Sequence, residues 1–168
     1  MTRAQQLIAA LGLEPHPEKG HYARTYSAPL QLSGSSLPHG APRPACTAIY
    51  FLLGDAERTT HLHRLKSDEL FHLYEGGPLD VLLLPPTGEG QVARLGRDVL
   101  AGERPQLVIP AGTWFGTELP DGVEHCLWGC TVAPGFDYAD FTLGDRQELI
   151  VAYPDFAEMI GALTGAAG

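Results

Sequence analysis

The chain is poor in basic residues. Its 168 residues include 11 lysines and arginines against 20 aspartates and glutamates, which gives a formal net charge of −9. Such a charge repels nucleic-acid phosphates, and no cluster of basic residues offsets it. The composition therefore argues against a nucleic-acid partner.

Cysteine is also scarce. Cys46, Cys126 and Cys130 are an odd number and contain no Cys-x-x-Cys pair. Buried thiols in a reducing compartment fit this pattern better than disulfides or a metal site. Cys126 and Cys130 would share one face of a strand about 13 Å apart, too far to chelate one metal ion.

Long apolar runs are missing, which argues against a membrane span or a membrane partner. The opening residues, Met-Thr-Arg-Ala-Gln-Gln, are typical of an ordinary helix and not of a signal peptide. We therefore expect a soluble, cytoplasmic protein. Its length suits one domain with a substantial core.

Turn-forming residues are abundant, with 20 glycines and 14 prolines, and they separate short apolar or alternating segments. This pattern predicts an antiparallel barrel or double sheet. The predicted strands are 47–53, 61–65, 69–74, 79–84, 91–95, 106–109, 114–119 and 125–132. Helical spacing predicts a helix over 2–11 and a helical segment over about 145–163. Residues 32–44, rich in Ser, Gly and Pro, predict a loop that could cover a pocket.

The most informative segment contains His61 and His63, followed by Glu69. Side chains alternate along a strand, so both histidines should point the same way, and a following antiparallel strand could bring Glu69 across from them. Two imidazoles and a carboxylate facing one cavity could bind a transition metal or carry out acid–base chemistry without one.

The same segment resembles the first motif of the cupin superfamily. Gly54, His61, His63, Glu69 and Gly76 occupy its places, with one extra residue before His61 and another before Glu69. The second cupin motif, Pro-x-Gly-x-x-His, is matched by Pro110 and Gly112 but has Phe115 where the third metal histidine belongs. The resemblance implies a jelly roll that is short of one metal ligand.

Four further stretches resemble the cupin family 5 type, a domain of uncharacterised function: 11–18, 66–72, 129–141 and 147–154. They follow the family's order over nearly the whole chain. The resemblance implies a single all-β cupin domain, an antiparallel jelly roll (double-stranded β-helix) with short terminal helices. Its parts would be an N-terminal helix and arm at 1–44, a core at 45–143 and a helical segment at 144–168.

The candidate residues fall into three groups. We expect His63 and Glu69 to be catalytic. A divalent transition metal (Zn, Fe, Mn or Ni), if one is used, would be held by His61, His63 and Glu69, with His125 as a stand-in for the missing ligand. The candidates for contact with a substrate are Arg64, Lys66, His72, Trp114, Phe115 and His125. Strand parity places His72 on the face opposite Glu69, while His16 and Glu18 fit a solvated turn better than a site.

Three functions follow, all with a small-molecule ligand. One is a metal-dependent isomerase or epimerase acting on a sugar-like polar substrate. A second is a metal-free, epimerase-like enzyme with His63 as base, oriented by Asp68, Glu69 or another carboxylate, and with a tyrosine as acid. The third is a non-catalytic ligand-binding or sensory protein. We also expect a homodimer, because open double sheets expose strand edges and apolar faces that association covers, and because the run 79–84 is too apolar for a half-exposed strand.

Overall fold

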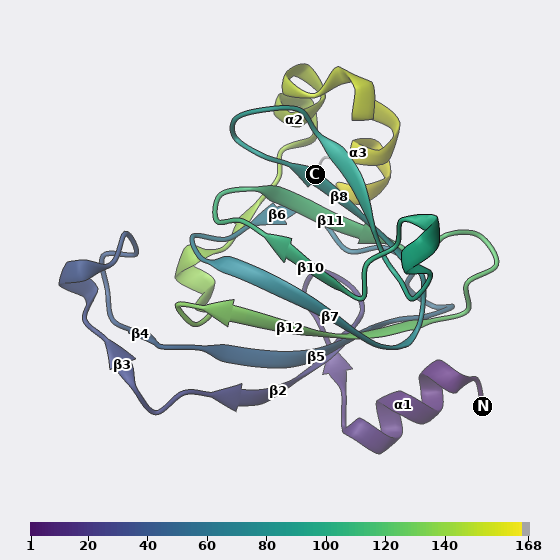
Figure 1. Ribbon diagram of the computed structural model, residues 1–168, viewed down its shortest axis with the longest axis horizontal. Helices are drawn as coiled ribbons and strands as arrows, with labels where there is room; N and C mark the ends of the chain where they lie inside the picture. The colour runs from purple at the N-terminus through teal and green to yellow at the C-terminus, as the bar shows by residue number, and fades with distance from the viewer. Residues whose placement is uncertain (166–168) are drawn as a thin grey trace.

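Two antiparallel sheets face each other in the computed structural model, which describes residues 1–165 (Figure 1). Every pairing between named strands in these sheets is antiparallel. The larger sheet has the order β1 (Glu14–Pro15), β2 (His21–Ser27), β5 (Thr47–Leu53), β12 (Cys126–Ala133), β7 (Asp68–Gly76) and β10 (Gln106–Ile109). The smaller has the order β13 (Thr142–Leu143), β6 (His63–Arg64), β11 (Trp114–Glu118), β8 (Leu79–Leu84) and β9 (Gln91–Leu95). The predicted antiparallel jelly roll is confirmed.

Helices cover the outer faces of both sheets. Helix α1 (Arg3–Leu11) begins at a capping box between Thr2 and Gln5 and packs on the larger sheet. Helices α2 (Arg146–Ala152) and α3 (Ala157–Leu163), separated by the 3₁₀ turn η4 (Pro154–Phe156), cover the smaller sheet. The two terminal helical segments predicted from sequence are therefore confirmed. No helix within residues 1–165 is long and apolar enough to cross a membrane.

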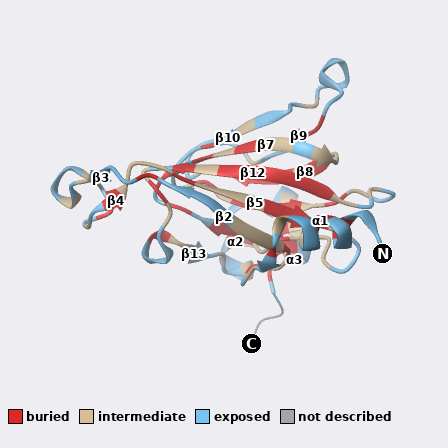
Figure 2. Ribbon diagram, turned by 90° about the horizontal axis from the view of Figure 1, so that it is seen from below, coloured by how far each residue is buried: buried red, intermediate tan, exposed pale blue. Residues whose placement is uncertain are grey.

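Strand β8 is apolar on both faces because both faces are covered within the chain. Leu79, Val81 and Leu83 belong to the core between the sheets, whereas Leu82 and Leu84 lie beneath α2 and α3. Figure 2 shows this strand among the buried ones. The argument for a homodimer from the run 79–84 was therefore wrong, since this apolar run needs no second copy to cover it. The dimer itself stays a prediction.

The connection from β2 to β5 projects from the body as an arm (Figure 1). It contains the short pair β3 (Gln31–Leu32) and β4 (Arg43–Pro44) and the 3₁₀ turn η1 (Gly34–Ser36). Its base is fixed by a buried ion pair, in which the Arg43 guanidinium donates to both carboxylate oxygens of Asp140 at 2.7 and 2.8 Å. Asp140 lies in the 3₁₀ turn η3 (Tyr138–Asp140); another such turn, η2 (Val99–Ala101), precedes β10.

Candidate functional site

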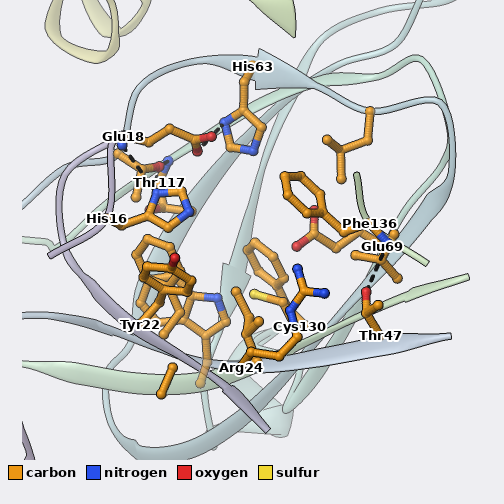
Figure 3. Close-up of a pocket in the computed structure, with 18 of the residues that line it drawn as sticks. His16, Glu18, Tyr22, Arg24, Thr47, His63, Glu69, Thr117, Cys130 and Phe136 are labelled. Atoms are coloured by element: carbon orange, nitrogen blue, oxygen red, sulfur yellow. Dashed lines mark hydrogen bonds and ion pairs between the residues drawn. The ribbon is translucent and has the colours of Figure 1, made fainter. Parts of the chain in front are cut away.

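A cavity of about 380 Å³ lies between the two sheets (Figure 3). Inward-facing side chains of the larger sheet form one wall, and those of the smaller sheet form the other. Aromatic residues are numerous in the lining: Tyr22, Phe51, Phe71, Phe115, Trp128, Phe136 and Tyr138. Among these, Phe115 is the one contributed by the smaller sheet. The polar and ionisable groups in the walls include His16, Glu18, Arg24, Thr60, His63, Glu69, Thr117 and Cys130.

His63 enters the cavity from β6, where it pairs with Phe115 of β11. Its Nδ1 lies 2.8 Å from the carbonyl oxygen of His61. Because a carbonyl can only accept a hydrogen bond, Nδ1 carries the proton, and Nε2 of the neutral ring keeps its lone pair. Figure 3 shows the second ring nitrogen directed toward the interior of the cavity. A base with a fixed tautomer therefore faces the cavity.

Glu18 lies on the other side of Nδ1, with its Oε2 at 3.0 Å from that atom. The turn that carries Glu18 is held at two backbone points: the His61 amide donates to the Glu18 carbonyl, and the Gly20 amide donates to the Glu57 carboxylate. Lys19, with φ of 74°, and Gly20, with φ of 76°, give this turn its left-handed backbone. The sequence places Glu18 far from His63, and this turn brings the two together.

Burial controls the protonation of this pair. It raises the pKa of Glu18 to about 9, with a further contribution from the nearby Glu69 carboxyl. It lowers the pKa of His63 to about 4. Near neutral pH the pair therefore carries no net charge, with one proton on Glu18 and one on Nδ1 of His63. His16 is also kept neutral, because burial lowers its pKa to about 4.

The Glu69 side chain points into the cavity from β7. It lies on the same face of the strand as Phe71 and on the face opposite Leu70, as expected from strand alternation. Its side chain is buried, and Oε2 has no hydrogen-bond partner among the described residues. Burial raises the pKa of Glu69 to about 7, against a smaller lowering by the neighbouring Cys130 thiol. Burial, with the Glu69 carboxyl beside it, raises the pKa of the Cys130 thiol well above its ordinary value. Near neutral pH, Glu69 can therefore either donate or accept a proton.

Of the predicted catalytic and metal residues, the structure brings His63 and Glu69 into one cavity and leaves His61 outside its lining. Strand β6 begins only at His63, so strand alternation does not extend back to His61. The His61 imidazole instead lies beside Gly165, where an added Cβ would be 3.0 Å from Cε1. The expectation that both histidines point the same way was therefore wrong.

Most of the predicted substrate contacts lie away from the cavity lining, and Phe115 is the one that lines it. The Arg64 guanidinium stacks 4.3 Å from the Trp114 ring centroid, and Trp114 packs against the group of residues under α2 and α3. Both belong to the outer side of the smaller sheet. Lys66 is half exposed, with Nζ 4.0 Å from an Asp140 oxygen.

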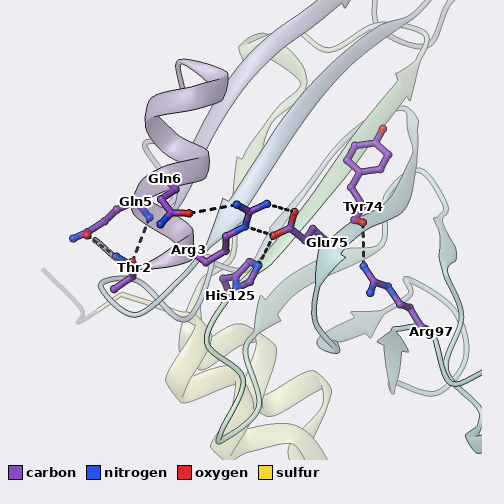
Figure 4. Close-up of polar contacts among 8 residues, drawn as sticks. All are labelled: Thr2, Arg3, Gln5, Gln6, Tyr74, Glu75, Arg97 and His125. Atoms are coloured by element: carbon purple, nitrogen blue, oxygen red, sulfur yellow. Dashed lines mark hydrogen bonds and ion pairs between the residues drawn. The ribbon is translucent and has the colours of Figure 1, made fainter.

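The two remaining histidines make structural contacts. His72 lies on the outer face of β7, as parity predicted, where Nε2 is 3.1 Å from the Thr131 hydroxyl. His125 lies 3.2 Å from Glu75, which also pairs with Arg3 of α1 (Figure 4). His125 therefore cannot supply the missing cupin ligand from this position.

The comparisons with known proteins agree with this geometry. Residues 5–144 match the family described as "Cupin superfamily (DUF985)". The chain belongs to this cupin family. The uncharacterized protein YML079W of Saccharomyces cerevisiae is 28% identical over 148 residues, which are 82% of this chain and 73% of the yeast protein.

Solved structures give the same assignment. A hypothetical protein from Leishmania major has a TM-score of 0.88 at 30% identity, covering 97% of this chain and 99% of the other. A protein from Shewanella oneidensis has a TM-score of 0.85 at 35% identity, covering 99% and 100%. Oxalate decarboxylase from Bacillus subtilis has a TM-score of 0.53 at 13% identity, covering 92% of this chain and 38% of that enzyme, which shows a shared fold alone.

The cupin metal site does not fit these residues. Phe115 occupies the second-motif position, with its ring centroid 4.1 Å from that of His63, and His61 is outside the cavity lining. No group of three or more His, Cys, Asp or Glu side chains within residues 1–165 is arranged to hold a metal ion. Nδ1 of His63 contacts the His61 carbonyl and the Glu18 carboxyl, so only Nε2 of this histidine is available to bind a metal ion.

Sequence reasoning missed two cavity residues in this cupin, His16 and Glu18, by assigning them to a solvated turn. The turn exists, but it folds inward over the cavity, and Glu18 is only 5% exposed. Asp68, one of the carboxylates considered for orienting His63, instead accepts a hydrogen bond from the Ala111 amide at 2.8 Å. Four closely spaced polar or charged residues between Glu14 and Lys19 were the signal available in the sequence.

Proposed function

We propose that this cupin is a metal-independent acid–base catalyst that moves a proton next to a carbonyl group of a small molecule, as isomerases and epimerases do. The observation that carries the proposal is the contact of His63 with Glu18 and the His61 carbonyl, which fixes the protonated nitrogen and points the basic one into the cavity. A sugar-like ring remains among the substrates we expect, since its apolar faces suit aromatic walls.

In this reaction, Nε2 of His63 removes the proton from the carbon beside the carbonyl group. The resulting imidazolium donates from Nδ1 to the His61 carbonyl. In those molecules whose Glu18 has already released its proton to solvent, the Glu18 carboxylate stabilises the imidazolium as well. Glu69 can supply a proton from the cavity wall to the enolate oxygen or to the other face of the carbon, since its pKa of about 7 leaves it partly protonated near neutral pH.

Solvent deuterium incorporation tests this proposal. Uncharged ketoses and other neutral keto sugars would be incubated with the protein in D₂O with excess chelator, and the loss of the proton signal beside the carbonyl would be followed by NMR. We expect exchange with at least one compound, reduced by about 10²- to 10⁴-fold in His63→Gln. His72→Gln is the matched control, because His72 lies outside the cavity lining, and it should exchange at the normal rate.

The result that overturns the proposal is exchange that persists in His63→Gln or that requires added metal. A compound that binds tightly in the cavity without exchanging would favour the non-catalytic ligand-binding protein instead.

Glu18→Gln probes the positioning role of the carboxyl. The His61 carbonyl still fixes the His63 tautomer in this variant. We therefore expect the exchange rate to fall on the order of tenfold, which is much less than the fall expected for His63→Gln. The pH profile of the unmodified protein should combine a fall as Glu69 loses its proton near pH 7 with a rising component toward pH 9 as Glu18 ionises, and only the rising component should be absent in Glu18→Gln. An unchanged pH profile in the variant would exclude Glu18 from the reaction.

A further inference from the structure

None of the buried residues that line the cavity, among those the structure describes, carries a permanent positive charge. Among the described residues that line it, Arg24 alone carries such a charge, and Arg24 is an exposed residue of β2. Two carboxyl groups, those of Glu18 and Glu69, are instead buried in the wall. An anionic group placed there would lose its hydration and gain no cation in exchange.

The walls themselves are aromatic and continuous. Phe51 stacks on Trp128 with centroids 4.8 Å apart and planes 29° apart. Phe71 lies 5.7 Å from Trp128 and 5.9 Å from Phe115, so the aromatic surface extends from one sheet to the other. Such a surface binds flat or ring-shaped groups through stacking and apolar contact.

Glu69 interrupts this apolar surface. It sits on the same strand as Phe71, two residues away, and the Cys130 thiol is the polar neighbour of its carboxyl group. Its Oε2 is buried without a hydrogen-bond partner among the described residues. A buried carboxyl with unused hydrogen-bonding capacity is costly, and a ligand hydroxyl or ring N–H would reduce that cost.

We propose that the cavity binds an uncharged, ring-shaped ligand whose hydroxyl or ring N–H meets Glu69, and that it discriminates against ligands that carry a phosphate or carboxylate into its depth. This inference rests on the proposed function for its site and names the substrate class for it. The volume of about 380 Å³ lies at the lower end of small-molecule pockets and suits one or two rings. Since His16 and His63 are neutral near pH 7, the exposed Arg24 is the one positive charge among the described lining residues, and none of the buried ones can balance an anion.

Matched pairs of neutral and anionic compounds test this inference by calorimetry or thermal shift, in the presence of chelator. The probes are uracil against orotate, and glucose and galactose against their 6-phosphates; adenine, guanine and a neutral pterin extend the neutral series. We expect one or more neutral probes to bind, with any anionic counterpart at least tenfold weaker. If the sugars bind, the cavity recognises a sugar ring; if the nucleobases or the pterin bind, it recognises a nitrogen heterocycle.

Three variants locate the binding. Phe71→Ala and Glu69→Gln should each weaken binding of the neutral probe by tenfold or more, and His72→Gln, at a residue outside the cavity lining, should leave it unchanged. The inference is overturned if the anionic member of a pair binds more tightly, if His72→Gln abolishes binding, or if none of the neutral probes binds. His63→Gln separates this result from the proposed function, since it should retain ring binding while losing deuterium exchange.

Discussion

Replacing Glu69 by glutamine should change how the stability of this cupin depends on pH. The Glu69 carboxyl is 7% exposed, has one oxygen without a partner, and contacts no cation among the described residues. Burial raises its pKa from the ordinary value of 4.5 to about 7. The charged form of this carboxyl is therefore disfavoured in the folded protein, and glutamine removes the charge while keeping nearly the same volume.

The expected magnitude follows from that difference in pKa. A carboxyl whose pKa moves from 4.5 in the unfolded chain to about 7 in the folded chain accounts for about 3 kcal/mol of folding free energy. This is an upper value, because the cavity can admit water and the side chain can move.

The sign is set by which state binds the proton more tightly. The folded chain binds the Glu69 proton more tightly, so the stabilising contribution is complete below pH 4.5 and is lost as the pH rises through about 7. The unmodified protein should therefore lose stability between pH 4.5 and pH 8 relative to Glu69→Gln, by up to about 3 kcal/mol.

Urea denaturation of both proteins at half-unit intervals from pH 4.5 to 8.5 measures this difference. If burying the glutamine amide changes the free energy of unfolding by the same amount at every pH, the curve of the variant is displaced but its pH dependence is unaffected. Glu89→Gln, which removes an exposed carboxyl of the same type, is the matched control and should show a flat difference. A flat difference for Glu69→Gln as well would refute the assignment of a raised pKa to Glu69.

Three further predictions concern the scaffold, and urea denaturation checks each of them. Gly20→Ala should destabilise the fold by more than about 1 kcal/mol, because a Cβ would lie 2.9 Å from the Leu52 carbonyl oxygen at a φ of 76°; a neutral effect would show that the Glu18 turn can move. Arg43→Met should cost about 3 kcal/mol, because the buried Asp140 carboxylate loses both hydrogen bonds from Arg43 and keeps only Lys66, 4.0 Å away, as a cation; Arg43→Met with Asp140→Leu should recover most of this cost. Leu82→Ala should cost about 2–5 kcal/mol because Leu82 is fully buried beneath the C-terminal helices, while Leu100→Ala, at a fully exposed site, should cost less than about 0.5 kcal/mol.

The sequence predicts those parts of the site that depend on local strand geometry. Alternation along β7 places Glu69 and Phe71 inward and His72 outward, as observed. The second cupin motif correctly places Phe115 beside His63. Alternation fails for His61 because the strand begins two residues later than expected, and a side chain before the strand has no fixed face.

Contacts between distant segments set the limit of sequence reasoning. The Glu18–His63 contact depends on a left-handed turn at Lys19, a non-glycine residue for which this backbone is uncommon. The burial of Leu82 and Leu84 likewise depends on where the C-terminal helices pack. Neither feature follows from the residues adjacent in sequence.

The protein handles its buried carboxyls in two different ways, and the contrast supports a functional cavity. Asp140 receives two charged hydrogen bonds from Arg43, which keep its pKa below the ordinary value, as expected of a carboxylate with a structural role. Glu18 and Glu69 are about as deeply buried, receive no such cation, and have raised pKa values. Burial of this kind costs stability, so a leucine or methionine in either place would serve the fold better. Two carboxyls without a cation around one tautomer-fixed histidine therefore fit the proposed acid–base site better than a purely structural role.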